Sequence, residues 1–448
     1  MDATIDRLIV AIQQRQLVVF CGAGISLAAP SSVPTAAGIT ASCVAKYNTR
    51  ALPPLPPSAT ATLEALTEHL FSNDLQSFFV RDLVPWRAFH RDANPQHVAV
   101  ADLLTSGAAA FGLTTNFDAL IELAAMDLGE DSFSAALDAN QANIRHDHNP
   151  FVKLHGCARD PDHTLWCRLQ LDAGPPVSDA NQRIRDRLDS LKTWLRANLR
   201  EKTVLFVGFW TDWGYLGNVL AESVDSVHIP LVVLVDPLTD AQLAAKAPEL
   251  WAWANASTQF IHLPVTAEVF LPRLREEFSR NLLTRVLRES ADGFRATKPG
   301  APIPPADFAV LSNPDMYSLR RDVYGVPSTR IPRYSQPDAS MDAVGRAHLL
   351  LRHAGARLDG PRYLNAAGQR IRLVNGKTKL LNRVRNEFAE ETPFVTGTDD
   401  DIVICAGATD DGGTPGHISR GSAAPTVVRP SSTTEWITLE LALARGLL

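Results

Sequence analysis

The sequence predicts an α/β fold in which helices cover both faces of a parallel, doubly wound sheet. Between residues 17 and 263, short apolar runs alternate with longer amphipathic segments. An apolar run without polar alternation suits a strand buried on both faces, and strands that alternate with helices suit parallel connections. Six runs are expected to form strands: "LVVF" at 17–20, "AAFGL" at 109–113, "FVKL" at 151–154, "VLFV" at 204–207, "LVVLV" at 231–235 and "FIHL" at 260–263.

Length, composition and cysteine usage indicate a soluble intracellular protein with more than one domain. A chain of 448 residues exceeds the usual size of a single core. The net charge of -6 singles out no partner class, and no apolar run reaches the roughly 18 to 20 residues that span a bilayer. Acidic residues stand where a secretion signal would be basic, so a cytoplasmic location is expected. An odd number of scattered cysteines argues against a disulfide framework: Cys21, Cys43, Cys157, Cys167 and Cys405.

Changes in composition along the chain predict its domain organisation. The first domain is expected over residues 1–280. Within it, the stretch "ALPPLPPS" must be an extended loop, and the helical pattern that follows makes residues 50–90 a small helical insertion. The stretch "TKPGAPIPPADF" at 297–308 is expected to be a Pro-rich linker. Residues 309–448 then form a second domain whose fold the sequence leaves open, with α+β as the expectation.

The second domain carries a basic strip and one Gly-rich stretch. Lys and Arg outnumber Asp and Glu between residues 310 and 387, where Tyr317, Tyr324, Tyr334 and Tyr363 also lie. Such a strip suits single-stranded nucleic acid, but a solvated face or a protein-docking surface is the preferred interpretation. The stretch "CAGATDDGG" at 405–413 follows an apolar run, so a small nucleotide pocket there stays an open alternative.

The first expected strand ends in "GAGIS", which has almost no side-chain bulk. Gly22 and Gly24 allow a tight turn, after which backbone N–H groups at the start of the next helix can approach a pyrophosphate. A third glycine would be needed at Leu27 for the hydride-transfer fingerprint, and no GK[ST] follows as in a P-loop. A lone GxG is equally compatible with a purely structural turn.

Polar residues also end the second, third and fourth strands. In "FGLTTNFDALIE" the candidates are Asn116 and Asp118, although Asp118 also suits a helix N-cap and Asn116 a loop amide. In "FVKLHGCA" His155 is a candidate general base, because an imidazole titrates near neutrality, although lone histidines are often structural. In "VLFVGFWTDWGYL" a strand is followed by Gly208 and Asp212, and Trp210 and Trp213 suit either an adenine site or core packing.

These four segments, in this order and at these separations, resemble the Sir2 (sirtuin) superfamily. The resemblance covers about residues 1–280. It implies a Rossmann-like domain with a smaller lobe, and NAD+ as a substrate whose nicotinamide–ribose bond is cleaved. By position, Asn116 would hold the ribose and an attacking water, Asp118 would lie near the nicotinamide, and His155 would be the base. The implied NAD+-binding residues are Gly22, Ala23, Gly24 and Ser26 at the pyrophosphate, Pro34 in the loop over the nicotinamide end, Gly208 and Thr211 on the adenosine side, Asp236 at the adenine ribose, and Thr115, for which no part of the ligand is specified.

Two departures from the family pattern narrow the range of functions that the resemblance implies. Protein-deacylating sirtuins bind zinc through two CxxC pairs, whereas the corresponding interval here holds only Cys157 and Cys167. Adding His155 and His163 fits no common metal spacing, so no zinc is expected. The Asp-Phe-Arg that follows the loop proline in deacylases is replaced by "TAA" at 35–37. Both losses argue against a peptide substrate.

What remains resembles the bacterial Sir2-like NADases of anti-phage defence. This resemblance implies an NAD+ glycohydrolase that is gated by homo-oligomerisation or by a partner bound to residues 309–448, such as a short Argonaute, a HerA-type ATPase or a phage protein. Nucleic acid would be contacted only indirectly. Two alternatives stay open: a module that binds NAD+ or ADP-ribose without turnover, and an NAD-dependent protein deacylase. The presence of Asn116 and His155 counts against the first, and the missing zinc lobe against the second.

Overall fold

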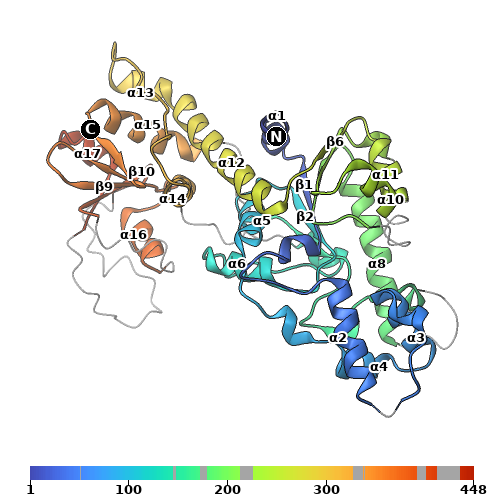
Figure 1. The fold of residues 1–448 in the computed structure, drawn as a ribbon. Helices are drawn as coiled ribbons and strands as arrows, with labels where there is room; N and C mark the ends of the chain where they lie inside the picture. Colours follow the sequence, from blue (N-terminus) through green and yellow to red (C-terminus); the bar gives the residue numbers. More distant parts are fainter. Residues whose placement is uncertain are drawn as a thin grey trace, which may run out of the picture. The chain divides into compact units, whose positions relative to one another are not determined.

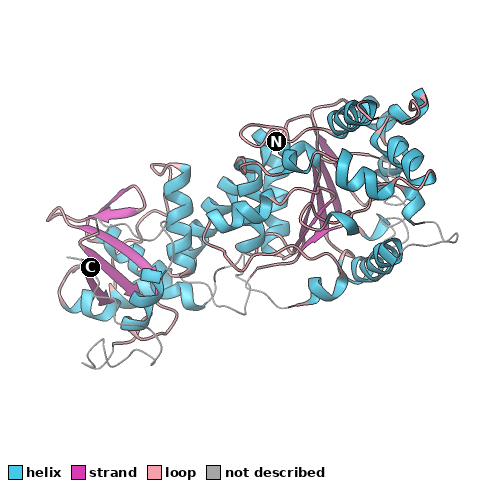
Figure 2. Cartoon of the chain, turned by 90° about the horizontal axis from the view of Figure 1, so that it is seen from below, coloured by secondary structure: helices cyan, strands magenta, loops and turns pink. Residues whose placement is uncertain are grey.

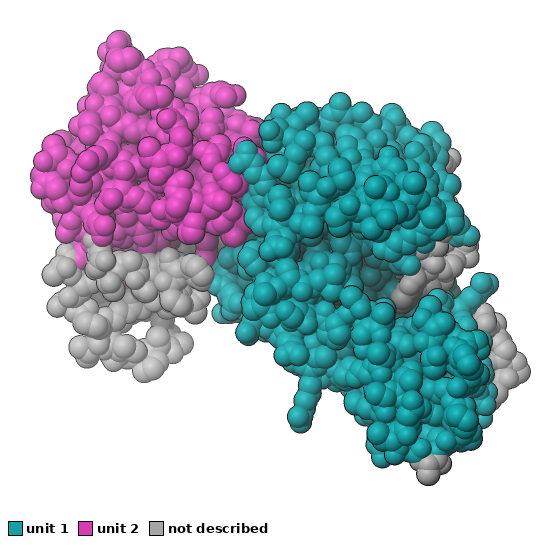
Figure 3. Space-filling view, in the orientation of Figure 1, with its two compact units in different colours: residues 1–274 teal, residues 275–448 magenta. Residues whose placement is uncertain are grey.

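The computed structural model describes residues 1–50, 52–144, 148–171, 179–211, 226–325, 337, 339–390, 400–410 and 434–448. The chain forms two compact units, Met1–Leu274 and Arg275–Leu448 (Figure 3). The division falls within helix α12 (Ala267–Glu289), and the Pro-rich residues 297–308 belong to the second unit. The domain boundary near residue 280 and the linker role of residues 297–308 stay predictions. Among the described residues, no helix combines the length and apolar content that crossing a bilayer requires.

The first unit is built on a six-stranded sheet in which all strands are parallel. Helices lie on both faces of this sheet (Figure 2), which confirms the predicted doubly wound α/β fold. The strand order is β3-β2-β1-β4-β5-β6, so the direction of winding reverses between β1 and β4. Open parallel sheets bind ligands outside the carboxyl ends of the strands at such a reversal. The strands are β1 (Leu17–Cys21), β2 (Phe111–Thr114), β3 (Phe151–Lys153), β4 (Thr203–Val207), β5 (Leu231–Val235) and β6 (Phe260–Leu263).

The register brings the ends of the central strands to one level. Cys21, the last residue of β1, pairs with Thr114 in β2 and with Val207 in β4. Every residue of β1, β2, β3, β4 and β5 is buried, as expected for apolar strands covered on both faces. The loops that follow Cys21, Thr114 and Val207 therefore begin side by side.

Helices and short helical turns connect these strands (Figure 1). They are α1 (Asp2–Gln13), η1 (Ala23–Ser26), α2 (Ala36–Asn48), η2 (Pro57–Thr60), α3 (Leu63–Ser72), α4 (Gln76–Phe78), η3 (Phe79–Leu83), η4 (Trp86–Phe89), α5 (Pro95–Thr105), α6 (Leu120–Asp127), α7 (Ala139–Asn143), η5 (Pro161–His163), η6 (Arg168–Gln170), α8 (Asp179–Asn198), η7 (Ser226–His228), α10 (Asp240–Lys246), α11 (Pro248–Asn255) and α12.

The segments between α2 and η4 form a small lobe with an apolar core of its own. Trp166, from the loop after β3, lies in this core although it is distant in sequence. Its ring centroid is 5.1 Å from that of Phe79, 5.7 Å from that of Trp86 and 4.6 Å from that of Phe117. The predicted helical insertion and the segment after β3 therefore pack together over the sheet.

The second unit has a mixed five-stranded sheet of order β11-β10-β9-β8-β7. Strands β9, β10 and β11 are parallel, whereas β7, β8 and β9 are antiparallel, so strands and helices occur together as expected for this region. Its elements are α13 (Ala291–Thr297), α14 (Asn313–Tyr324), α15 (Ala339–His353), β7 (Arg357–Asp359), β8 (Arg362–Leu364), β9 (Arg370–Asn375), α16 (Leu381–Glu390), β10 (Ile402–Ala406), β11 (Glu435–Thr438) and α17 (Leu439–Ala444).

Part of the basic strip in this unit is interior. Arg372 is buried and pairs with Asp322 at 2.5 Å, while Arg362 bonds Asp322 at 3.3 Å and Asp400 at 2.6 Å. Tyr363 is buried as well. The composition predicts a solvated or docking face for these side chains, but the charges of Arg362 and Arg372 are neutralised by carboxylates inside the unit, and the Tyr363 ring is in the interior. Tyr334 and residues 411–413 of the Gly-rich stretch lie outside the described residues, whereas the beginning of that stretch is the end of β10.

Candidate nucleotide-binding site

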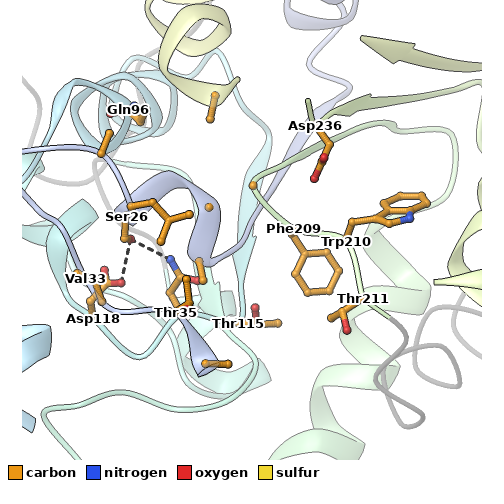
Figure 4. A pocket seen from close by; sticks show the side chains of 18 of the residues that line it. Ser26, Val33, Thr35, Gln96, Thr115, Asp118, Phe209, Trp210, Thr211 and Asp236 are labelled. Atoms are coloured by element: carbon orange, nitrogen blue, oxygen red, sulfur yellow. Dashed lines mark hydrogen bonds between the residues drawn. The ribbon is translucent and has the colours of Figure 1, made fainter. Parts of the chain in front are cut away.

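A cavity of about 710 Å³ opens at the carboxyl ends of the strands of the first unit (Figure 4). Its walls come from the loops after β1, β2, β3, β4 and β5 and from the start of α12. The structure brings together in this cavity all the predicted site residues except Gly22: Ala23, Gly24, Ser26, Pro34, Thr115, Asn116, Asp118, His155, Gly208, Thr211 and Asp236.

The glycines at one wall of the cavity are required by a contact between two loops. A Cβ on Gly24 would lie 2.6 Å from the Cα of Gly208, and one on Gly22 would lie 2.5 Å from the carbonyl oxygen of Gly208. The N–H of Gly24 donates to that oxygen at 2.8 Å, and the N–H of Gly22 donates to the carbonyl of Val207 at 3.1 Å. Both N–H groups therefore already have acceptors, and a pyrophosphate role for these two residues stays a prediction.

The Ser26 hydroxyl joins three elements through hydrogen bonds. It donates to Asp118 Oδ2 at 3.0 Å, lies 3.0 Å from His97 Nε2, and accepts from Asn116 Nδ2 at 3.3 Å. His97 Nδ1 accepts the backbone N–H of Asn94 at 3.2 Å, so the proton of the neutral ring is on Nε2. Burial lowers the pKa of His97 to about 3, which keeps the ring neutral. A chain of hydrogen bonds thus runs from His97 through Ser26 to Asp118.

His97 is absent from the residues that the motifs predict, although a local signal precedes it. Asn94 caps α5, Pro95 occupies its first turn, and His97 completes a capping box. This pattern predicts where the helix begins. It does not predict that the helix start lies against η1, which only the tertiary structure shows.

Asn116 and Asp118 are both held from several sides. Asn116 Nδ2 also donates to the carbonyl of Gly22 at 3.2 Å, which fixes its amide. Asp118 Oδ1 accepts the N–H of Leu120, the first residue of α6, at 3.2 Å. The N-cap residue of α6 is Ala119, so Asp118 precedes the cap and does not form it, contrary to the alternative interpretation of this residue. Burial raises the pKa of the Asp118 carboxyl, and Lys153 and the N–H of Leu120 lower it only in part.

His155 follows β3 and lines the cavity with its ring buried. Burial, reinforced by the positive charge of Arg187, lowers the pKa of His155 well below its ordinary value of 6.5. Arg187 on α8 donates to the carbonyls of Leu154 and His163, at 3.1 Å each, and so braces the chain on either side of this loop. His155 is therefore a neutral imidazole at physiological pH.

Lys153 connects the loops that carry these residues. Its ammonium lies 2.8 Å from Glu122 on α6, donates to the carbonyl of Asp118, and lies 3.6 Å from the sulfur of Cys157. Burial lowers the pKa of Lys153, but Glu122, Cys157 and Asp118 together raise it by more, so the side chain is charged. The motif "FVKLHG" contains this lysine, but its position in a buried strand predicts no partner.

The opposite side of the cavity is formed by Thr211, Asp236 and Trp210. Asp236 Oδ1 accepts the N–H of Leu238 at 2.9 Å. Trp210 donates from Nε1 to the carbonyl of Leu243 at 3.0 Å and packs edge-on against Trp251, so it is part of the core as well as of the wall. Asp212 and Trp213 lie outside the described residues.

The described residues contain no group of three or more His, Cys, Asp or Glu side chains arranged to hold a metal ion. His163 contacts the carboxylate of Asp160 at 2.9 Å. Burial raises the pKa of the Cys167 thiol to about 11, so the sulfur is protonated. The expectation that no zinc is bound stays a prediction.

A parallel, doubly wound sheet with a ligand-sized cavity at its reversal point is a Rossmann-like fold, the architecture in which nucleotides commonly bind at this position. Residues 111–226 match the family model of the SIR2-like domain, which supports the Sir2 superfamily predicted from the motifs. No curated protein sequence matches the chain. One similar solved structure, described as "The Structural basis for Sirtuin Substrate affinity", is 15% identical with a TM-score of 0.32 over 61% of this chain and 97% of the other. A Sir2 homolog–NAD complex is 15% identical with a TM-score of 0.34 over 61% of this chain and 93% of the other.

Proposed function

We propose that the protein is an NAD+ hydrolase that cleaves the nicotinamide–ribose bond and releases nicotinamide and ADP-ribose. One observation carries the proposal: Asn116, Asp118 and a neutral His155, from two different loops, line the same cavity as the Gly-rich turn after β1. The cavity volume of about 710 Å³ lies within the range of cofactor sites.

The residues of the cavity suit the two ends of this substrate. Asp236 and Thr211 offer hydrogen-bonding groups to an adenosine ribose. Apolar side chains, including Val33, Leu63 and Phe117, line the cavity toward the small lobe and suit the nicotinamide ring. The carbonyl oxygen of Asn116 is buried without a hydrogen-bond donor among the described residues, so it is available to a ligand.

Cleavage of the nicotinamide–ribose bond requires the protein mainly to position the substrate and the attacking water. The breaking C–N bond leaves its electron pair on the pyridine nitrogen, which was positively charged, so departure requires no general acid. Water then bonds to the ribose carbon and gives up one proton. His155 accepts this proton directly or through a ribose hydroxyl, and Asn116 holds the water in place.

The segment after Pro34 gives less support to a peptide substrate than the cavity gives to NAD+. Thr35, which stands in the segment that replaces the deacylase triplet, accepts the N–H of Gly38 at 3.2 Å and begins α2. This segment is therefore used to start a helix.

Release of nicotinamide from NAD+ tests the proposal. Wild type is expected to release it, whereas His155→Ala and Asn116→Ala are expected to lose release and to keep binding of ADP-ribose. His228→Ala, at an exposed position in η7, is the matched control and should resemble wild type. Binding of NAD+ without release under any condition would instead support a sensor module, and deacylation of an acetyl-lysine peptide would support a deacylase.

An ungated enzyme of this kind would exhaust the NAD+ of its own cell. We therefore include in the proposal that activity is gated by oligomerisation or by a partner that contacts residues 309–448, as in an anti-phage defence effector. Co-expression with products of neighbouring genes, followed by NAD+ measurement and size-exclusion chromatography, tests this part. Constant activity in every state would exclude a gate.

A further inference from the structure

Two carbonyl oxygens of the cavity wall are buried without a hydrogen-bond donor among the described residues: Gln96 Oε1 and Asn116 Oδ1. The side chain of Asn116 belongs to the proposed reaction. Gln96 does not, and it is 1% exposed. A buried carbonyl oxygen that lacks a donor carries the full cost of its desolvation, so each such atom in a native site requires an explanation. A hydrogen-bond donor on a bound ligand supplies this explanation.

Gln96 is held rigidly at the beginning of α5. Its backbone N–H donates to Asn94 Oδ1 at 3.1 Å, and Asn94 Nδ2 donates to the carbonyl of Ile25 at 2.8 Å. The next residue, His97, contacts the hydroxyl of Ser26. The start of α5 is thus fixed against η1 and holds Gln96 beside Ser26.

This position is at one end of the cavity. In Figure 4, Gln96, Ser26 and Asp118 lie on one side of the view, and Asp236 and Trp210 lie on the other. Since Asp236 belongs to the side that suits adenosine, Gln96 belongs to the side that suits the leaving group.

Hydrogen-bond acceptors dominate this end. Gln96 Oε1, Asn116 Oδ1 and the carboxyl of Asp118 line it, whereas Lys246, at the end of α10 beyond β5, is the one Lys or Arg among the described residues that line the cavity. A ligand group placed here must offer N–H donors and must not be negatively charged. A primary carboxamide on a positively charged pyridine ring meets both conditions.

We propose that Gln96 is a specificity-determining residue, whose side-chain carbonyl accepts a hydrogen bond from the carboxamide of the nicotinamide group. The inference rests on the proposed function, because it takes NAD+ as the substrate. It predicts that a carboxylate in place of the carboxamide, as in nicotinic acid adenine dinucleotide, is rejected, because the carboxylate has no N–H to donate and adds negative charge beside Asp118.

Equilibrium binding tests the inference without turnover. Each protein carries His155→Ala, so that NAD+ is not consumed, and is titrated with NAD+, nicotinic acid adenine dinucleotide and ADP-ribose. The His155→Ala protein should bind NAD+ at least about tenfold more tightly than the acid analogue. Adding Gln96→Met should weaken NAD+ binding about tenfold and leave ADP-ribose binding unchanged, since ADP-ribose lacks the nicotinamide.

Two further variants complete the test. Gln182→Met, at an exposed position of α8 outside the cavity, is the matched control and should change none of the three affinities. Gln96→Glu retains an acceptor oxygen, so it should restore NAD+ binding relative to Gln96→Met and should weaken binding of the acid analogue further.

The failures of the inference and of the proposed function give different results. Equal NAD+ affinity with Gln96 and with Met at this position, while ADP-ribose still binds, overturns the inference and leaves the hydrolase proposal standing. A loss of NAD+ binding in Gln96→Glu as large as in Gln96→Met also overturns it. If neither NAD+ nor ADP-ribose binds to any of the proteins, the proposed function fails and the inference fails with it.

Discussion

Gly24 and Gly208 occupy loops that are far apart in the sequence, and a Cβ on Gly24 would lie 2.6 Å from the Cα of Gly208. The backbone of each loop therefore lies where a side chain of the other would be. The carbonyl of Gly208 accepts the N–H of Gly24 at 2.8 Å, and Gly208 has a φ of +62°, which favours glycine. This contact joins the loops after β1 and β4 at the point where the sheet reverses.

Replacing Gly24 should therefore disrupt the site through the backbone. Gly24→Ala forces the two loops apart, and we expect a loss of about 2–4 kcal/mol in the free energy of unfolding, together with weaker ADP-ribose binding. Chemical denaturation and titration measure the two effects. Gly293→Ala in α13 is the matched control, because its Cβ would meet no heavy atom closer than 3.4 Å and alanine favours the helix. Equal stability of the two variants would contradict the contact.

The pH dependence of NAD+ cleavage should report the environment of His155. Because burial and Arg187 lower its pKa well below 6.5, the imidazole is unprotonated at pH 6 and stays active as a base. An unperturbed histidine would be roughly three-quarters protonated at that pH. We expect the acid limb of kcat/KM to lie clearly below pH 6.5.

Substitutions of Arg187 test directly whether His155 sets the acid limb of the kcat/KM profile. Arg187→Met removes a positive charge, which favours the protonated ring, so the pKa of His155 should rise and the acid limb should move to higher pH. Arg187→Lys retains the charge and should leave the limb closer to that of wild type. A limb that does not move in Arg187→Met would show that the titrating group is not His155.

The buried ion pair of Lys153 and Glu122 predicts a double-variant result. Lys153→Met leaves a buried carboxylate without its cation and should cost about 3–5 kcal/mol in the free energy of unfolding. Replacing both residues, as in Lys153→Met/Glu122→Leu, removes the unpaired charge and should recover much of this loss. Denaturation of the two single variants and of the double variant measures the coupling. A double variant that is no more stable than Lys153→Met would show that the bond from Lys153 to the Asp118 carbonyl matters more than the ion pair.

His97 predicts a dependence of stability on pH. Its pKa is lowered to about 3 in the folded protein, so between pH 6.5 and 3 the unfolded chain binds a proton that the folded chain does not. The free energy of unfolding therefore falls as the pH falls through this range, by up to about 1.4 kcal/mol per pH unit from this one residue.

His97→Gln removes that contribution. Although the variant loses stability at neutral pH, its free energy of unfolding should fall less steeply than that of wild type between pH 6 and pH 4.5. Denaturation at several pH values measures the two slopes. Identical slopes would mean that His97 is protonated in the folded protein, and the hydrogen-bond chain from its ring to Ser26 would then be wrong.

The strands of the first unit could be predicted because apolar patterning reports burial directly. The runs at 17–20, 204–207, 231–235 and 260–263 became β1, β4, β5 and β6 with bounds that differ by at most one residue, and only the run at 109–113 moved, since β2 begins at Phe111. Hydrogen bonding to neighbouring strands decides where a strand begins and ends, and the sequence does not display those neighbours.

Charged side chains of the second unit show a limit of composition. Arg372 belongs to a strip that composition places at the surface, yet it is buried against Asp322. A count of charges along the chain does not show which of them find partners. Burial of a charge becomes tolerable only when a partner of opposite sign lies within reach, and that depends on how the strands and helices assemble.

By itself, the sequence identified three polar residues that reach the cavity, because polar residues that end parallel strands meet at one edge of the sheet, and Asn116, Asp118 and His155 do so. Tertiary structure alone decided what surrounds them. The hydrogen bond between His97 and Ser26 and the bridge from Lys153 to Glu122 join elements that are separated in the chain, and the carbonyl of Gln96 is buried because such elements pack together. Strand patterning depends on local periodicity, whereas these polar contacts depend on which elements pack together, and only the assembled fold sets that.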